Sequence, residues 1–206
     1  MKITKMLTAL LFIVAAGCNP KLEIEDDQDF DTTVTETDAQ ASDIHGGSPV
    51  PEDWDSCNAM PGNHPCNFSF EDQYGDAFEL YDNYGKVIVL DFSTMWCSVC
   101  QNLAPDIQAY QDTYGPRGFL WVTVLVDNSS GEPPTADDIQ DWSTMFGIET
   151  SPVLVGDRSI VDLTGTTGYP ISSWPTMVVI DKEMVIYNGL HGWNETTILS
   201  WIEGLL

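Results

Sequence analysis

The spacing of hydrophobic and polar positions changes several times along the chain, and each change predicts a different kind of segment. Residues 6–16 form an uncharged, mostly apolar run, and residues 19–56 are polar and acidic. From residue 57 onward, apolar runs of strand length alternate with stripes of helical spacing. This pattern predicts one mixed α/β domain over residues 57–206, long enough to build a core, behind two segments that lie outside it.

The expected strands of this domain are short apolar runs bounded by turn residues. Residues 87–92 and 119–126 are almost continuously apolar, which is typical of strands covered on both faces. Shorter strands are expected as an N-terminal hairpin at residues 68–70 and 77–81, a single strand at 153–155, and a second hairpin at 176–180 and 184–187.

Three helices complete the pattern. Residues 98–114 place apolar side chains at spacings of four and three. Residues 135–146 begin at Thr135, a suitable N-cap residue, with acidic residues in the first turn. Residues 194–206 form the last expected helix, with apolar side chains on its inward face.

The first apolar run has the features of an export signal. Lys2 and Lys5 precede it, and its eleven residues fall short of the roughly 20 that a spanning helix needs. It ends in Ala15-Ala16-Gly17-Cys18, which resembles the bacterial lipobox. We therefore expect residues 1–17 to be a lipoprotein signal peptide and Cys18 to carry the lipid anchor, in the bacterial cell envelope and facing the periplasm or the exterior. An ordinary cleaved signal is the alternative.

Charge separates the next segment from the domain. The chain has 32 acidic against 7 basic residues and a formal net charge of −25, which disfavours nucleic acid as a partner. Residues 18–56 combine low hydrophobicity with clustered acids, so we expect an acidic disordered tether. The alternating Asp27, Asp29 and Asp31 suggest a calcium loop instead, but the Gly and Glu of an EF-hand are missing.

Cys97-Ser98-Val99-Cys100 carries the chemistry, because it follows the expected strand at residues 87–92 and opens the first helix. Unpaired N–H groups and the helix dipole favour a thiolate at such a position. The spacing of three brings Cys100 under Cys97, so we expect an exposed attacking Cys97 and a buried resolving Cys100.

Two other interpretations of the cysteine pair are an inert bridge and half of a zinc site. The remaining candidate zinc ligands are scattered: Cys57, Cys66, His45, His64 and His191. We therefore expect no metal and no cofactor.

The segment around the cysteines resembles the thioredoxin superfamily. Asp91 stands six residues before Cys97, Trp96 directly precedes it, and Pro105 stands five residues after Cys100. Further along, Trp174-Pro175-Thr176 resembles the family's cis-proline loop. The resemblance implies a thioredoxin-like fold, a central mixed sheet flanked by helices.

The resemblance also implies roles for these residues. Asp91 would be a buried acid that accepts the proton of Cys100. Pro175 would be cis and place the backbone of Trp174 beside Cys97, where an extended client segment pairs with it. Trp96, Trp174, Pro175 and Thr176 would form the substrate-binding rim.

Within the superfamily, the chain resembles the TlpA/ResA-like redoxin branch of bacterial lipoproteins. This resemblance implies a membrane-anchored thiol–disulfide oxidoreductase that reduces protein disulfides and exchanges electrons with a membrane partner. ResA-like proteins often carry an acid three residues after the second cysteine, where this chain has Leu103. The particular client of ResA therefore does not carry over.

Other functions remain as alternatives. Thr94-Met95-Trp96-Cys97 matches the T-x-x-C pattern of a peroxiredoxin, but Leu90 stands where that family has proline, and neither Arg117 nor Arg158 lies in an obvious site segment. A copper-handling protein of the Sco type would need three residues between the cysteines and a late histidine. A binding lipoprotein without enzymatic activity is a further alternative.

Cys57 and Cys66 enclose a loop rich in turn residues. We expect a structural disulfide between them. A second redox pair that relays electrons to Cys97 is the alternative.

Overall fold

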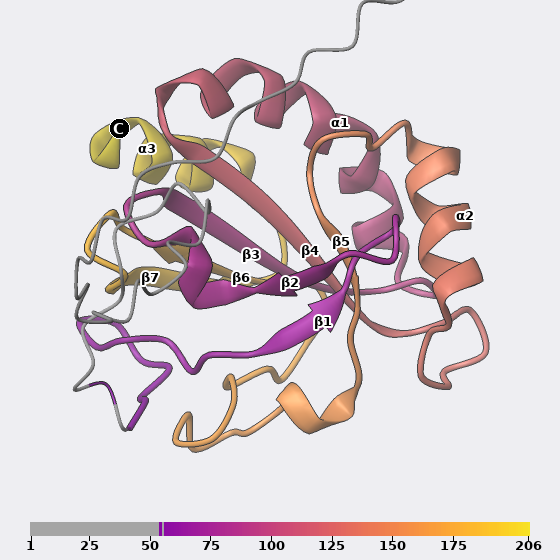
Figure 1. Ribbon diagram of the computed structural model, residues 1–206, viewed down its shortest axis with the longest axis horizontal. Helices are drawn as coiled ribbons and strands as arrows, with labels where there is room; N and C mark the ends of the chain where they lie inside the picture. Colours follow the sequence, from indigo (N-terminus) through magenta and orange to yellow (C-terminus); the bar gives the residue numbers. More distant parts are fainter. Residues whose placement is uncertain (1–53, 55) are drawn as a thin grey trace, which may run out of the picture. The chain divides into compact units, whose positions relative to one another are not determined.

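The computed structural model describes Trp54 and residues 56–206, so the expected signal peptide, Cys18 and nearly all of the expected tether lie outside the described residues. The elements are β1 Ser69–Glu71, β2 Ala77–Glu79, η1 Leu80–Asn83, β3 Val87–Thr94, α1 Ser98–Tyr114, η2 Gly115–Arg117, β4 Phe119–Asp127, α2 Ala136–Phe146, β5 Val153–Val155, η3 Arg158–Ile160, β6 Thr176–Ile180, β7 Ile186–His191 and α3 Glu195–Leu205 (Figure 1). Among these residues, no helix is both long and apolar enough to span a bilayer.

The central sheet has the strand order β5-β4-β3-β6-β7. Strands β3, β4 and β5 are parallel, and β6 runs antiparallel to β3 and to β7. All residues of β3 and β4 are buried, which confirms the expectation from their continuous apolar runs. The carboxyl ends of β3, β4 and β5 therefore meet at one edge of the sheet, where α1 begins.

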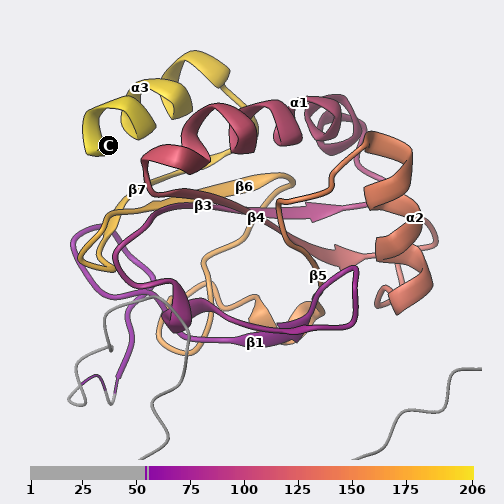
Figure 2. The ribbon, with the colours of Figure 1, turned by 45° about the horizontal axis from the view of Figure 1, so that its top comes forward.

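The two faces of the sheet are covered differently. Side chains of α1, α2 and α3 pack in one apolar cluster with alternate residues of β3, including Val87 and Val89. The opposite face of β3, with Leu90 and Phe92, packs against the β1–β2 hairpin and neighbouring loops (Figure 2). The thioredoxin-like fold and the N-terminal hairpin are thus confirmed, with the hairpin covering the face that the three helices leave open.

The second hairpin differs from the sequence prediction at its turn. The strand expected at residues 184–187 begins at Ile186 and continues to His191. The Asp181 side chain accepts hydrogen bonds from the N–H groups of Glu183 and Val185, and Met184 has a φ of 56°. The turn therefore extends to residue 185, and the strand starts later than the apolar side chains suggested.

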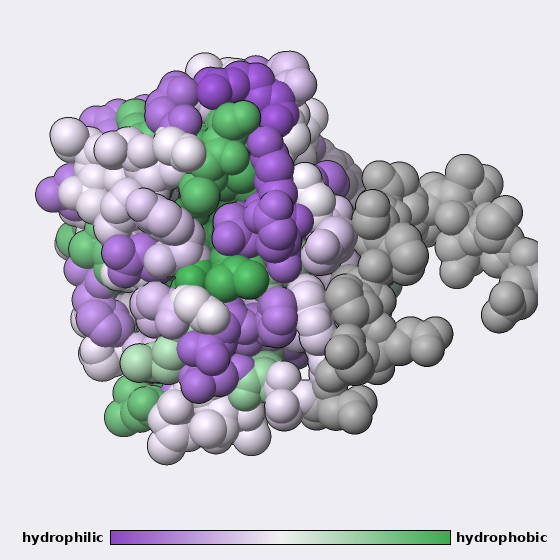
Figure 3. Space-filling model, turned by 90° about the vertical axis from the view of Figure 1, so that its left-hand side faces the viewer, coloured by the Kyte–Doolittle hydropathy of each residue, from purple (hydrophilic) through white to green (hydrophobic). Residues whose placement is uncertain are grey.

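Part of the outer edge of β7 is covered by the loop between Cys57 and Cys66. Gly62 donates to the carbonyl of Ile186, and the N–H of Ile186 donates to the carbonyl of Asn63. The side of the molecule that carries β7 shows a band of hydrophobic surface between hydrophilic residues (Figure 3). Because the loop between Cys57 and Cys66 covers part of the β7 edge, it limits pairing of that edge with other chains.

Candidate active site

The redox pair lies where β3 ends and α1 begins. Cys97 is the N-cap residue of α1, and its Sγ accepts a hydrogen bond from the N–H of Cys100 at 3.4 Å. The first turn of α1 carries no acidic residue, so the positive end of the helix dipole is not offset there. The backbone N–H groups that open α1 are therefore directed toward the sulfur of Cys97.

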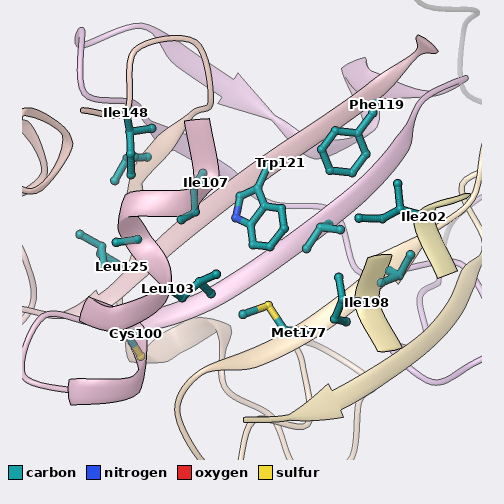
Figure 4. Close-up of a cluster of buried hydrophobic side chains, with 14 of the residues drawn as sticks. Cys100, Leu103, Ile107, Phe119, Trp121, Leu125, Ile148, Met177, Ile198 and Ile202 are labelled. Atoms are coloured by element: carbon teal, nitrogen blue, oxygen red, sulfur yellow. The ribbon is translucent and has the colours of Figure 1, made fainter. Parts of the chain in front are cut away.

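Both cysteines are more enclosed than the sequence suggested. Cys97 is only 7% exposed, although we expected an exposed attacker, and Cys100 is 1% exposed. The carbonyl of Trp174 contributes to the enclosure of Cys97, because it accepts a hydrogen bond from Sγ at 3.6 Å, and the surrounding apolar cluster encloses both cysteines. Cys100 is the less exposed of the two, and Figure 4 shows it at the start of α1 among residues of the apolar cluster on this face of the sheet.

Asp91 lies on β3 beneath the redox pair. Alternation along the strand puts Asp91 and Ser93 on the same face as Val89, which is the face that α1 covers. The hydroxyl of Ser93 donates to Asp91 Oδ1 at 2.6 Å, and the hydroxyl of Thr123 on β4 donates to Oδ2 at 3.4 Å. Asp91 is 1% exposed, so the carboxyl group is buried and held by two hydroxyl groups.

Burial controls the acidity of both groups. It raises the pKa of Asp91 to about 6, against the opposing effect of the hydrogen bonds from Ser93 and Thr123. Burial also raises the pKa of the Cys100 thiol, and the charge of Asp91 and the side chain of Cys97 raise it further. A hydrogen bond with Ser93 acts in the opposite direction. Burial therefore favours the neutral thiol at Cys100 and makes the neighbouring Asp91 a weaker acid than an exposed carboxyl group.

The cis-proline loop forms one side of the site. The peptide bond between Trp174 and Pro175 is cis, in agreement with the expectation from the resemblance. Thr176 begins β6, and its hydroxyl donates to the carbonyl of Ser173 at 2.7 Å and contacts His191 Nδ1 at 3.0 Å. These contacts fix the loop that carries the carbonyl of Trp174 over Cys97.

The rim around the cysteines differs from the predicted one. Trp96 is 48% exposed, as a rim residue would be, whereas Trp174 is half-buried and packs against both apolar clusters. Val99, between the two cysteines, is an exposed apolar residue that the sequence analysis did not single out. Arg158, which we had placed outside any site segment, lies over the ring of Trp174.

Cys57 and Cys66 form a disulfide, with 4.7 Å between their Cα atoms. Cys66 belongs to the apolar cluster on the hairpin face of the sheet, whereas Cys97 and Cys100 belong to the cluster on the helix face. Direct exchange between the two pairs would have to cross the sheet, so we interpret the disulfide as structural.

Replacing both Cys57 and Cys66 by alanine is expected to lower the free energy of unfolding by about 2–3 kcal/mol, because a closed loop of about ten residues restricts the unfolded chain. Urea unfolding would measure the difference, and thiol–disulfide exchange should stay within about twofold of the wild type. A loss of exchange activity in a variant that remains folded would instead favour the relay.

The expected lipid site, Cys18, lies outside the described residues. Within residues 56–206 and Trp54, no three side chains of His, Cys, Asp or Glu are grouped as a metal site would require.

A cysteine pair at the start of α1, a buried acid beneath it and a cis-proline beside it define a thioredoxin-like dithiol site. The chain belongs to the AhpC/TSA family, whose profile matches residues 61–188. It is 28% identical to the thioredoxin of Coprinus comatus over 98 residues, which cover 48% of this chain and 86% of that protein.

Two bacterial proteins extend the comparison. The chain is 24% identical to the thiol-disulfide oxidoreductase ResA of Halalkalibacterium halodurans over 124 residues, 60% of this chain and 64% of ResA. The crystal structure of the exposed lipoprotein thioredoxin Etrx1 from Streptococcus pneumoniae is 29% identical, with a TM-score of 0.56 over 68% of this chain and 100% of that one. The protein is a thiol–disulfide oxidoreductase of the redoxin family.

Proposed function

We propose that the protein is a membrane-anchored, extracytoplasmic reductase of protein disulfides. The observation that carries this proposal is the buried arrangement of Asp91, Ser93 and Cys100 directly beneath the N-capping Cys97. It provides a nucleophile at the surface of the site, a resolving thiol behind it, and a base for that thiol.

The reaction proceeds in two exchanges. The Cys97 thiolate attacks one sulfur of a client disulfide, a mixed disulfide forms, and the other client sulfur leaves as a thiolate. Cys100 then transfers its proton to Asp91, directly or through Ser93, and attacks the sulfur of Cys97. The Cys97–Cys100 disulfide forms and the second client thiolate leaves, so two electrons pass from the enzyme to the client.

The reducing direction rests on the resemblance of the chain to the TlpA/ResA-like branch and on its similarity to ResA. Regeneration of the dithiol then requires a reducing dithiol partner, which we place in the membrane.

The reduction potential of the Cys97–Cys100 pair tests this function. The full chain is equilibrated with mixtures of reduced and oxidised dithiothreitol or glutathione, and a value of about −270 mV, as in thioredoxin, is expected. A value of about −120 mV would identify an oxidant, and the absence of a two-electron transition would overturn dithiol exchange. Faster reaction with hydrogen peroxide than with disulfides would favour the peroxidase alternative.

The anchor is supported by the sequence Ala15-Ala16-Gly17-Cys18 and by the likeness to an exposed lipoprotein thioredoxin. A Cys18→Ala variant is expected to leave the membrane fraction and to lose incorporation of labelled palmitate, because no acyl chain can be attached. Membrane retention equal to that of the wild type would contradict lipid anchoring.

A further inference from the structure

Two tryptophans flank Cys97, and a pair of opposite charges lies between them. Trp96 precedes Cys97 in the chain, and the carbonyl of Trp174 accepts the hydrogen bond of its thiol. The charges belong to Asp127, at the end of β4, and to Arg158, at the start of η3. The mechanism described above uses neither of them.

The four side chains form one continuous set of contacts. The indole N–H of Trp96 donates to Asp127 Oδ2 at 3.2 Å. Arg158 donates to Asp127 twice, from Nε to Oδ1 at 2.9 Å and from Nη2 to Oδ2. The guanidinium carbon of Arg158 lies 5.8 Å from the centre of the Trp174 ring, within the range of a cation–π contact.

Local backbone features aim Asp127 at this position. The register between β3 and β4 shifts at their ends, so that Thr94 pairs with Asp127 instead of Val126, and the N–H of Met95 donates to the carbonyl of Asp127. Such irregularities redirect side chains at sheet ends. Asp127 is 1% exposed, so its charge requires a partner.

Arg158 is brought to Asp127 by the connection after β5. Gly156 approaches the backbone of Leu125 so closely that a Cβ there would lie 2.7 Å from the carbonyl oxygen. Asp157 then caps η3 through the N–H of Ser159 at 2.6 Å, which sets Arg158 as its first residue. Its side chain keeps 61% of its surface exposed.

Within residues 56–206, Arg158 is the single Lys or Arg at this end of the sheet. Lys86 precedes β3, Arg117 precedes β4, and Lys182 lies in the turn between β6 and β7, all at the opposite end. No other cation in this part of the chain is placed to pair with Asp127.

We propose that Asp127 and Arg158 form a bracket that holds Trp96 and Trp174 at a fixed separation on the two sides of Cys97, which makes Arg158 a positioning residue for polypeptide clients. A guanidinium group presents two parallel donors to one carboxylate and a flat face to an aromatic ring, and an ammonium group does neither. The inference rests on the proposed function, because an extended client segment needs a fixed rim on both sides of its cysteine and a small disulfide does not.

The test compares two targets of Cys97, a peptide that contains cysteine and the single amino acid N-acetylcysteine. The full chain carrying Cys100→Ala is mixed with a nine-residue peptide whose central cysteine is linked to thionitrobenzoate, or with N-acetylcysteine linked in the same way. Cys97 attacks the cysteine sulfur, thionitrobenzoate leaves as the better leaving group, and its absorbance gives a second-order rate constant. The chain with an intact bracket is expected to react faster with the peptide.

Adding Arg158→Met is expected to lower the peptide rate constant about tenfold, as the loss of one well-formed contact would, and to leave the N-acetylcysteine rate within about twofold. Arg158→Lys is expected to restore only part of the loss. The reduction potential of the Cys97–Cys100 pair, measured with Cys100 present, should equal that of the wild type.

Two further variants control for folding and charge. Arg117→Met removes a cation whose partner, Glu203 at 3.0 Å, is exposed like itself, and no change in either rate is expected. Arg158→Met leaves a buried carboxylate unpaired and so destabilises the fold. The double variant Asp127→Asn with Arg158→Met removes that charge, and it is expected to fold and to show the same slow peptide reaction.

Several outcomes would overturn the bracket. These are equal losses with peptide and N-acetylcysteine, an unchanged peptide rate in Arg158→Met, full recovery with Arg158→Lys, and no preference for the peptide in the parent chain. A parent chain that releases no thionitrobenzoate from either compound would overturn the proposed exchange function itself, and the bracket with it.

Discussion

Replacing Cys100 by alanine is expected to convert the enzyme into a trap for its clients. Cys97 retains its N-cap position and attacks a disulfide, but no second thiol is present to break the mixed disulfide that forms. Turnover with protein disulfides should fall by at least about a hundredfold, because release then depends on external thiols. Non-reducing electrophoresis and mass spectrometry would show the adducts and identify the client.

Two matched variants serve as controls: one removes Cys97 instead of Cys100, and the other removes both cysteines. Cys97→Ala is expected to form no adduct, because Cys100 is 1% exposed and burial raises the pKa of its thiol. The double alanine variant reports any background from other cysteines. Adducts that form through Cys100 in Cys97→Ala would show that the order of attack is reversed.

The second large effect is expected from Asp91→Asn. The amide keeps the size of the side chain but cannot accept the proton of Cys100, so resolution of the mixed disulfide should slow about a hundredfold near pH 7. The wild-type rate of this step should rise as the pH passes about 6, where Asp91 ionises. The variant should lack that rise, which stopped-flow measurement of client release at several pH values would show.

The same substitution is expected to stabilise the protein. The pKa of Asp91 is about 6 in the folded state, above its ordinary value of 3.8, so the folded state binds the proton more tightly than the unfolded state does. Between about pH 4 and pH 6, rising pH therefore lowers the free energy of unfolding of the wild type, by up to about 3 kcal/mol in total. The free energy of unfolding of Asp91→Asn should therefore be close to that of the wild type at pH 4 and should exceed it by the full amount above pH 6.

A control separates this effect from a general response to lost charge. Asp106 is an exposed carboxylate on α1, and Asp106→Asn is expected to change neither resolution nor stability by a measurable amount. If urea unfolding at pH 7 showed Asp91→Asn to be less stable than the wild type, the buried charge of Asp91 would not lower the free energy of unfolding as we infer. An unchanged rate of resolution would remove Asp91 from the reaction.

The sequence by itself predicted the fold class and the reacting pair. Continuous apolar runs identified β3 and β4, because strands covered on both faces have no polar alternation. Helical spacing identified α1 and α2, and Thr135 was predicted as the N-cap of α2. The structure adds the reciprocal hydrogen bonds between Thr135 and Asp138. Cys97 and Cys100 were predicted as the reacting pair because their spacing within one short segment is local information, whereas Asp91 was assigned from the resemblance to the thioredoxin superfamily.

The sequence also contained a signal that we did not use. Ser93 stands two residues after Asp91 on an expected strand, and strand alternation alone puts the two side chains on the same face. The hydrogen bond of 2.6 Å between them follows from that placement. Thr123 carried no comparable signal, because its position opposite Asp91 depends on the register between β3 and β4.

Only the tertiary structure decided what surrounds Cys97. The resemblance predicted the backbone of Trp174 beside Cys97, but apolar spacing does not specify how closely a distant segment packs, so it did not predict that Cys97 would be only 7% exposed. Likewise, Arg158 follows β5 by three residues and meets Asp127 only because parallel strands end at the same edge of the sheet. Local spacing along the chain thus determined the elements and the reacting atoms, whereas contacts between distant segments, which depend on strand order and register, determined the rim that encloses them.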